Sequence, residues 1–304
     1  MPEGIPAPML GTLAFEVELQ LGEVYDLGRT QFGDRTLTEV KGGRATGAKL
    51  NATVADRGLD WQLTLPNRAV EIEQVMVLRT DDGTNIFMRI CGTAPASDMK
   101  ARVVPDIEAP NNGNYSWLND AKLVGTRAFD PSAKTMKFAF YTVVEAGNAA
   151  APTLQIEQPD DLPNQSWDCA PAMGERGDVL YNASVNIDAA SIPVGASKRG
   201  NRNIVPITGG TFSGRITGTV LSGGADFQLG SVTDLHLDAR YTLKTNDGEL
   251  IIIRNCGTFS SVVPVYETRE DGPYAFVNRG PWLGTGTGVG AGVVNMTIYA
   301  TTSP

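Results

Sequence analysis

The clearest alternation of apolar and polar residues runs from Leu235 to Leu243. Every second residue in this stretch is apolar, and those between are polar or charged. Side chains of a strand point alternately to its two faces, so the pattern predicts a strand with one apolar face. A turn sequence, Asn246-Asp247-Gly248, and a second apolar run, Leu250 to Ile253, follow directly. The stretch therefore reads as a β-hairpin.

Similar short strands are predicted along the rest of the chain. Residues Leu13–Leu21 and Val179–Ile187 alternate in the same way, and no helical period separates such runs. The chain also contains 34 glycines and 18 prolines, which are typical of frequent turns. These features predict an all-β protein.

The order of these strands repeats. Leu59–Leu63 (LDWQL) returns as Ala225–Leu229 (ADFQL), and Arg89–Thr93 (RICGT) returns as Arg254–Thr258 (RNCGT). Repetition in the same order indicates an internal duplication. We predict a first, more divergent copy over residues 1–146, a connector over 147–177 that includes Trp167 and Cys169, and a second copy over 178–304.

Each copy has the strand density of an antiparallel sandwich or barrel. We favour two tandem barrels, because closure removes the exposed edges that short strands otherwise leave.

Composition narrows the possible partners and compartment. The net charge of −9 argues against nucleic acid and anionic membrane as partners, and no apolar run approaches the length of a membrane span. The N-terminus lacks the pattern of a secretion signal. Three cysteines without a C-x-x-C motif favour reduced thiols and a cytoplasmic protein.

The sequence gives little support for a metal site or a nucleotide-binding site. The single histidine, His236, rules out sites that need two histidines, and we interpret it as a solvent-facing strand residue. The glycine-rich run Gly284–Gly292 is followed by a strand-like segment, whereas a nucleotide loop precedes a helix. We therefore expect no metal and no cofactor. Cys91 and Cys256 are equivalent, and their repetition indicates packing more than a nucleophilic pair.

Polar residues that recur at strand ends are the best candidates for chemistry. A carboxylate near an arginine inside a barrel can supply an acid, a base and a cation. The candidate catalytic residues are Arg240, Glu267, Asp226, Tyr241 and Arg254. The candidate ligand-binding residues are Trp61, Asp60, Arg89, Glu108, Trp117, Phe227, Tyr274, Phe276 and Asn278. The alternative is that the charged residues form a structural ion-pair network and the aromatic ones core packing.

Arg240 and Tyr241 lie on opposite faces of one strand, so at most one points into a given barrel. The first copy has Val75 and Met76 at these positions. Met76 keeps the apolar character of Tyr241, whereas Val75 lacks the charge of Arg240. This difference favours Arg240 as the residue with a local, ligand-directed role.

The segments GGADFQ, DARYTLKTNDG, YET and YAFVNR resemble the domain-of-unknown-function 3237 family. The resemblance is close over residues 178–304 and looser over 12–145. It implies a lipocalin-like antiparallel β-barrel with a ligand-sized interior, and it implies no settled activity.

Three functional hypotheses remain open. The first is a cofactor-free, non-redox enzyme of the isomerase, lyase or cyclase type, acting on an apolar or aromatic small molecule held in a barrel, as in secondary metabolism. The second is a lipocalin-like carrier of such a ligand. The third is a structural pair of barrels, with homo-oligomer formation possible. A cavity lined by Arg240 and a carboxylate favours the enzyme, and an entirely apolar cavity favours the carrier.

Overall fold

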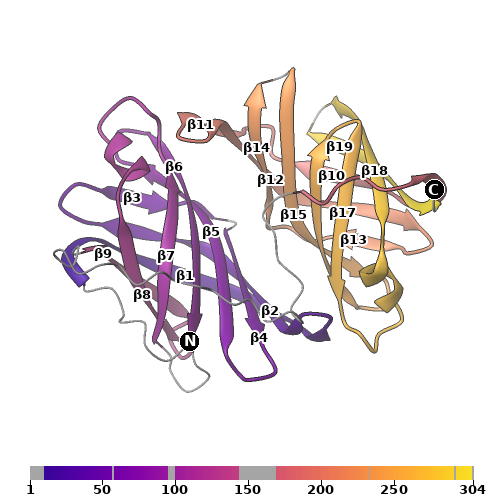
Figure 1. Cartoon of the computed structure of the whole chain (residues 1–304), viewed down its shortest axis with the longest axis horizontal. Helices are drawn as coiled ribbons and strands as arrows, with labels where there is room; N and C mark the ends of the chain where they lie inside the picture. The colour runs from indigo at the N-terminus through magenta and orange to yellow at the C-terminus, as the bar shows by residue number, and fades with distance from the viewer. Residues whose placement is uncertain are drawn as a thin grey trace, which may run out of the picture.

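The computed structural model describes residues 10–56, 58–94, 100–143, 169–231, 233–290 and 292–302. Most of the predicted connector, including Trp167, lies outside these ranges. Strands contain 71% of the described residues, and the chain forms two barrels side by side (Figure 1). The prediction of an all-β protein with two duplicated antiparallel barrels is confirmed. Among the described residues, no helix has the length and apolar character needed to cross a membrane.

The first barrel contains nine strands and one 3-10 helix: β1 Leu10–Thr30, β2 Gly33–Thr46, β3 Asn51–Val54, β4 Gly58–Thr64, β5 Val70–Thr80, β6 Asn85–Ala94, β7 Lys100–Glu108, η1 Ser116–Asn119, β8 Leu123–Asp130 and β9 Thr135–Val143. All neighbouring pairs are antiparallel. The long strand β1 pairs with both β2 and β9, and this double pairing closes the sheet into a ring.

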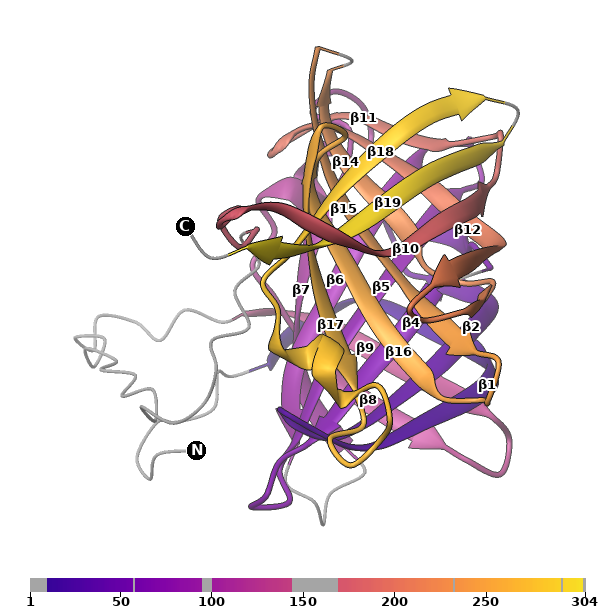
Figure 2. The ribbon, with the colours of Figure 1, turned by 90° about the vertical axis from the view of Figure 1, so that its right-hand side faces the viewer.

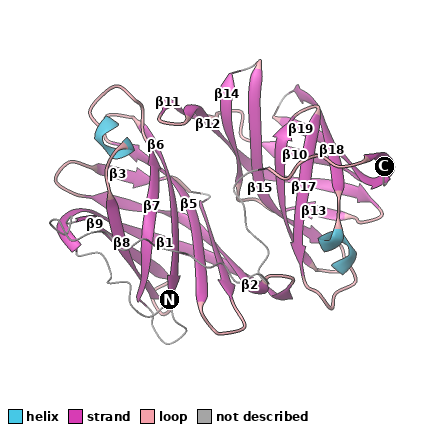
Figure 3. Cartoon of the chain, in the orientation of Figure 1, coloured by secondary structure: helices cyan, strands magenta, loops and turns pink. Residues whose placement is uncertain are grey.

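The second barrel repeats this order: β10 Glu175–Ile187, β11 Ile192–Ser197, β12 Gly200–Gly214, β13 Gly218–Val220, β14 Ala225–Ser231, β15 Asp234–Thr245, β16 Leu250–Thr258, β17 Ser261–Thr268, η2 Ala275–Arg279, β18 Trp282–Gly290 and β19 Val293–Thr302. Here β10 closes the ring by pairing with β12 and β19. Figure 3 shows the small share of helix, one short turn in each barrel.

The hairpin predicted around Leu235–Leu243 is present as β15 and β16. Its apolar face points into the second barrel, where Leu237, Tyr241 and Leu243 join the buried core. Its polar face points outward. The glycine-rich run forms most of strand β18 and pairs with β19, which agrees with rejecting a nucleotide loop.

The two barrels share a third apolar cluster between them. Leu37, Trp61 and Phe87 of the first barrel pack with Ile204 and Phe227 of the second. Trp61 and Phe227 are repeat equivalents, as are Leu37 and Ile204, so matching surfaces of the two copies face each other. This is the arrangement of a two-fold homodimer interface, formed here within one chain.

Two hairpin tips reach across this interface in opposite directions (Figure 1). Figure 2 looks from the second barrel towards the first, which lies behind it. The β1–β2 tip reaches β17, where Thr30 and Arg35 contact Glu267. The β11–β12 tip reaches the first barrel, where Ser197 and Arg202 contact Glu108. Because Arg35 and Arg202 are repeat equivalents, as are Glu267 and Glu108, the two clasps are copies of one contact.

Candidate functional site

A row of three inward-facing residues crosses the wall of the second barrel. The pairing of β14, β15 and β16 places Asp226 opposite Ala239, and Ala239 opposite Asn255. All three line a cavity of about 550 Å³. The small side chain of Ala239 leaves space between the two polar ones.

The rest of the cavity wall is mainly apolar. Its inner part includes Val185, Ile207, Leu237, Val262 and Met296. Towards the end of the barrel it is bordered by Ile187–Ala189, Ser191, Phe259 and Gly292. A volume of this size suits a drug-sized molecule, and a mostly apolar wall with a few polar groups is typical of ligand pockets.

The Asp226 carboxyl is the acidic group of this row of three residues. Its Oδ2 accepts a hydrogen bond from Gln228 Nε2 at 2.9 Å, and its Oδ1 accepts one from the backbone N–H of Asp238 at 3.0 Å. Burial raises the pKa of Asp226 from 3.8 to about 7, and the two hydrogen bonds oppose this rise without cancelling it. The carboxyl is therefore able to give or take a proton near neutral pH.

Asn255 and Tyr241 form the second polar group. Asn255 Nδ2 donates to the Tyr241 hydroxyl at 2.8 Å, and both residues are buried. Among the described residues, Asn255 Oδ1 has no hydrogen-bond partner. Burial raises the pKa of the Tyr241 phenol, so it remains neutral at physiological pH.

The first barrel carries a different interior at the same positions. The row is Asp60, Gln74 and Ile90 in place of Asp226, Ala239 and Asn255. Asp60 is fully buried, and its Oδ2 lies 2.8 Å from Arg127 Nη2.

The counterpart of Arg127 in the second barrel is glycine. Val103 pairs with Gly125 two residues before Arg127, and Val262 pairs with Gly284 two residues before Gly286. The second barrel thus lacks the cation at this position. Phe259 and Met296 occupy the space instead, since a Cβ placed on Gly286 would lie 2.7 Å from Phe259 and 3.2 Å from Met296.

The candidate residues predicted from sequence separate into several groups. Asp226 and Tyr241 line the cavity, whereas Arg240, Arg254 and Glu267 lie outside it. The structure reverses the expected orientation of the Arg240–Tyr241 pair, because Tyr241 points inward and Arg240 lies between the barrels.

Arg240 and Arg254 belong to a charged cluster at that interface. Arg240 Nη1 lies 2.7 Å from Glu73 Oε1 of the first barrel, and both arginines contact Asp238. Burial alone would raise the pKa of the Asp238 carboxyl, but the interactions with Arg240 and Arg254 hold it below its usual value. This cluster matches the ion-pair network considered as the alternative from sequence.

Glu267 and Glu108 are the buried carboxylates of the two clasps. Glu267 Oε1 accepts hydrogen bonds from Thr30 Oγ1 at 2.6 Å and Arg35 Nε at 2.9 Å. Glu108 lies 2.7 Å from Arg202 Nη2. Each carboxylate joins one barrel to the other.

The remaining aromatic and amide candidates lie in or beside the 3-10 turns. Asn278 bonds both backbone groups of Thr268, which ties η2 to β17. Phe276 packs against Trp282 beside this turn, and Tyr274 donates to Asp247 at the surface. Trp117 lies in the matching turn, η1, of the first barrel. None of these four residues lines the described cavity.

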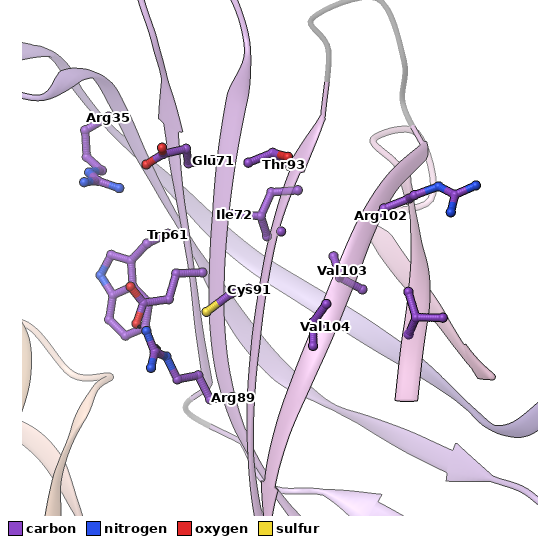
Figure 4. Close-up of a pocket in the computed structure, with 13 residues that line it drawn as sticks. Arg35, Trp61, Glu71, Ile72, Arg89, Cys91, Thr93, Arg102, Val103 and Val104 are labelled. Carbon is purple, nitrogen blue, oxygen red and sulfur yellow. Dashed lines mark ion pairs between the residues drawn. The ribbon is translucent and has the colours of Figure 1, made fainter. Parts of the chain in front are cut away.

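A second hollow, of about 490 Å³, lies on the first barrel (Figure 4). It is bordered by Trp61, Arg89 and Cys91, with Glu73 beside Arg89. Burial raises the pKa of the Cys91 thiol and lowers that of Arg89 to about 10. A protonated thiol is a weak nucleophile, so these features support the packing interpretation of Cys91.

Cys256, the equivalent of Cys91, has a different partner. It forms a disulfide with Cys169, and the imidazole Nε2 of His236 lies 3.6 Å from Cys169 Sγ. The prediction of three reduced cysteines is therefore wrong, because the fold brings together two residues that are 87 apart in sequence. The three side chains have the proximity of a metal site. The disulfide, however, removes the two thiolates that a metal would need.

Sequence reasoning missed Asn255, Gln228 and the Arg127–Gly286 difference. The signal for Asn255 was present in the repeat, where a polar residue replaces Ile90 at an inward position between Arg254 and Cys256. Arg127 faces Asp60 from a distant strand, and no local pattern connects them.

The fold defines a duplicated antiparallel β-barrel protein with a cavity in its second barrel. The chain belongs to the family described as "Protein of unknown function (DUF3237)", whose model matches residues 11–144 and again residues 177–263.

Curated relatives carry the related name UPF0311. A UPF0311 protein of Bradyrhizobium diazoefficiens is 37% identical over 84 residues, which are 27% of this chain and 55% of the relative, so the match spans about half of that relative's length. One of Rhodopseudomonas palustris is 43% identical over 130 residues, which are 38% of this chain and 84% of the relative. The solved structure of a conserved protein of unknown function from Rhodopseudomonas palustris aligns with a TM-score of 0.41 and 25% identity, covering 45% of this chain and 100% of that one.

Proposed function

We propose that the second barrel is a non-redox acid–base enzyme that encloses a small apolar molecule, with Asp226 as the group that transfers the proton. The observation that supports this most directly is a carboxyl with a pKa of about 7 on the wall of a mainly apolar cavity. Groups whose pKa matches the working pH are the efficient general acids and bases.

Asp226 is held in place for this role. Gln228 and the Asp238 N–H fix the orientation of its carboxyl, and Gln228 is itself bonded by Asn203. Proton transfer by a positioned side chain of this kind contributes about 10²–10⁴ in rate. The mainly apolar wall suits isomerisation, elimination or cyclisation of an apolar bound molecule.

The ionic residues outside the cavity have no direct part in this chemistry. Arg240, Arg254 and Glu267 contact other protein groups at the interface between the barrels. The proposed reaction therefore uses a neutral polar pair, Asn255 and Tyr241, where the sequence favoured a cation.

A carrier without catalysis is the second candidate, and the predominantly apolar wall favours it. The cavity meets only half of the criterion set from the sequence, since a carboxylate lines it and Arg240 does not. A carrier uses the same cavity but has no need of an acid at position 226.

Conversion of captured ligands separates the two candidates. Small molecules retained by the purified protein from a metabolite extract are identified by mass spectrometry, then incubated with wild type and Asp226→Asn. The enzyme proposal expects products equal in mass to the substrate or different by one water, formed by wild type and at least 100-fold more slowly by the variant. Retention without conversion supports the carrier, and a two-hydrogen mass change would contradict non-redox chemistry.

A further inference from the structure

Asp226 has an open hydrogen-bonding position that its counterpart in the first barrel has filled. Asp60 Oδ2 accepts one hydrogen bond from Gln62 Nε2 at 2.6 Å and a second from Arg127 Nη2 at 2.8 Å. Asp226 Oδ2 accepts the equivalent bond from Gln228 Nε2 at 2.9 Å, and no second donor reaches this oxygen from the residues that the structure describes. The second barrel therefore keeps the carboxyl and its amide partner but lacks the cation.

The Asp226 carboxyl is accessible from the cavity. Asp60 is fully buried, whereas Asp226 is partly exposed and lines the cavity of about 550 Å³. Gln228 and Asn203, which hold the carboxyl in place, line the same cavity and are also partly exposed. A molecule bound in the cavity can therefore contact this side of Asp226.

The charged groups around Asp226 leave its own charge without a counter-ion. Arg202 acts on Asp226 from the neighbouring strand β12, but its guanidinium is paired with Glu108 in the clasp. Asp238 acts on it from β15 and has the opposite effect. The other charged residue of the described cavity lining, Asp188, is also acidic. Within the described ranges, no cation forms an ion pair with Asp226.

An ammonium group on the ligand fits this position. It donates to a carboxylate oxygen as Arg127 does, in a charge-assisted hydrogen bond that is roughly twice as strong as one between neutral groups. It also pairs the carboxylate that a bound apolar molecule would otherwise cover, and an unpaired buried charge is costly. An anionic ligand would instead lie beside two carboxyl groups, those of Asp188 and Asp226.

We propose that the ligand is a small amine with an apolar body, whose ammonium group pairs with Asp226 as Arg127 pairs with Asp60. The apolar body lies against the wall formed by residues such as Leu237 and Val262. As a substrate class this inference rests on the proposed function, whereas the ion pair does not need Asp226 to transfer a proton.

The test compares naphthylmethylamine with naphthylmethanol, which differ by an ammonium in place of a hydroxyl. Affinities are measured by calorimetry at about pH 8, where the amine is protonated and Asp226 is mostly ionised. The proteins are wild type, Asp226→Asn and the matched control Asp188→Asn, which removes the other carboxyl of the cavity lining. Thermal unfolding confirms that each variant is folded.

Wild type should bind the amine at least about tenfold more tightly than the alcohol, and Asp226→Asn should lose this preference. Asp188→Asn should keep it within about threefold of wild type. A wild type without the preference, or a folded Asp226→Asn variant that retains it, would overturn the inference. An equal loss in Asp188→Asn would also overturn it, because the preference would then reflect negative charge in general.

The pH dependence of binding to wild type tests the same ion pair without a substitution. Burial raises the pKa of Asp226 to about 7, so a proton competes with the ammonium below this pH. Affinity for the amine should therefore rise about tenfold from about pH 6 to about pH 8, and affinity for the alcohol should not rise. Asp226→Asn retains His236 and every other titrating group, and in this variant the rise should disappear.

An amine affinity that does not change with pH in wild type would contradict the ion pair even if Asp226→Asn failed to fold. The proposed reaction fails or holds separately. Binding of the amine without conversion of any ligand would support the carrier and leave the ion pair in place. Conversion of a neutral ligand by a protein that shows no preference for the amine would retain the reaction and refute the ion pair.

Discussion

Asp60 and Asp226 occupy the same position in two copies of one barrel, yet only Asp60 faces a guanidinium. Arg127 lies 2.8 Å from Asp60, whereas the equivalent position opposite Asp226 is Gly286. One substitution at a distant strand therefore separates a buried ion pair from a carboxyl with a pKa of about 7 beside a cavity. The duplication allows one barrel to serve as the reference for the other.

Replacing Asp226 with Asn should change how stability depends on pH. Because its folded pKa of about 7 exceeds the ordinary value of 3.8, the folded protein binds this proton more tightly than the unfolded chain. The stabilisation is complete below pH 3.8 and is lost as the pH rises to about 7. Unfolding by urea should show Asp226→Asn gaining stability relative to wild type across this window and then levelling off.

Subtracting the unfolding free energy of wild type from that of the variant at each pH cancels the contribution of the other carboxyl groups. A difference that is constant across the window would mean that Asp226 is ionised throughout in the folded protein. The proposed acid–base role would then lose its support.

The Asp60→Asn substitution should destabilise the protein, in contrast to Asp226→Asn. It leaves Arg127 buried without its anion, and breaking a buried pair in this way costs about 3–5 kcal/mol. The free energy of unfolding measures the loss. In the double variant Asp60→Asn, Arg127→Met the unpaired charge is removed, so much of the stability should return. A loss below about 1 kcal/mol for the single variant would indicate that the pair behaves as a surface contact.

The local pattern of the sequence was enough to predict the hairpin, its faces and the duplication. Alternation from Leu235 to Leu243 separated the two faces of the strand correctly. The choice of Arg240 as the ligand-directed residue was wrong, because the apolar face with Tyr241 lines the cavity. The repeated motifs then predicted two barrels of the same topology.

The functional assignment of the polar residues did not follow from the same information. Glu108, Glu267, Arg89 and Arg254 recur in both copies, and recurrence is expected equally of a site and of a two-fold interface. Only the packing of one barrel on the other distinguishes these cases. The exchange of Arg127 for Gly286 was likewise hidden, because Arg127 acts on Asp60, which is 67 positions away in sequence and lies across the barrel.

Glu267→Gln should reduce stability without affecting turnover per folded molecule. The change leaves Arg35 without its anion at the interface, and a loss of about 2–4 kcal/mol is expected. Glu108→Gln is the matched change in the other clasp and should cost a similar amount. Urea unfolding and activity are measured on the same samples. Normal stability with strongly reduced turnover in Glu267→Gln would place that carboxylate in the reaction.

Arg240→Met tests whether Arg240 joins the two barrels or acts on a ligand in the cavity. It removes the contact to Glu73 across the interface, so we expect lower stability and nearly unchanged affinity for naphthol, used as a small aromatic probe of the cavity. A folded Arg240→Met variant that lost this affinity tenfold or more would show that the cluster reaches the ligand after all.

The disulfide should be detectable directly. Peptide mapping without reductant is expected to join Cys169 to Cys256 and to leave Cys91 open to alkylation after unfolding. The bond closes a loop of 87 residues, which in the chain-entropy account is worth about 4.6 kcal/mol. Cys169→Ser should lower stability by an amount of this order, with Cys91→Ser as the control. Excess chelator should change neither stability nor turnover, and a metal-dependent recovery would contradict this.

Gly286→Arg tests the central comparison by giving the second barrel the residue of the first. The new side chain starts beside Phe259 and Met296, whose nearest atoms lie 2.7 and 3.2 Å from the position of its Cβ, so Phe259 must move aside. The guanidinium is then placed to pair with Asp226 as Arg127 pairs with Asp60. We expect the affinity of the cavity for a small aromatic probe such as naphthol to fall at least tenfold, because the new side chain fills the cavity. Gly286→Ala introduces the same Cβ without the charge and should retain most of the binding.

The Gly286→Arg variant should also change the pKa of Asp226. An arginine beside Asp226 favours the ionised carboxyl, so the pKa of Asp226 should fall. The difference in unfolding free energy between Gly286→Arg and the double variant Gly286→Arg, Asp226→Asn should then no longer depend on pH above about pH 4. In the Gly286→Ala background the difference should persist. If Gly286→Arg closes the cavity but leaves this titration unchanged, the guanidinium has not reached the carboxyl. Filling of space, and not the missing cation, would then be the main difference between the two barrels.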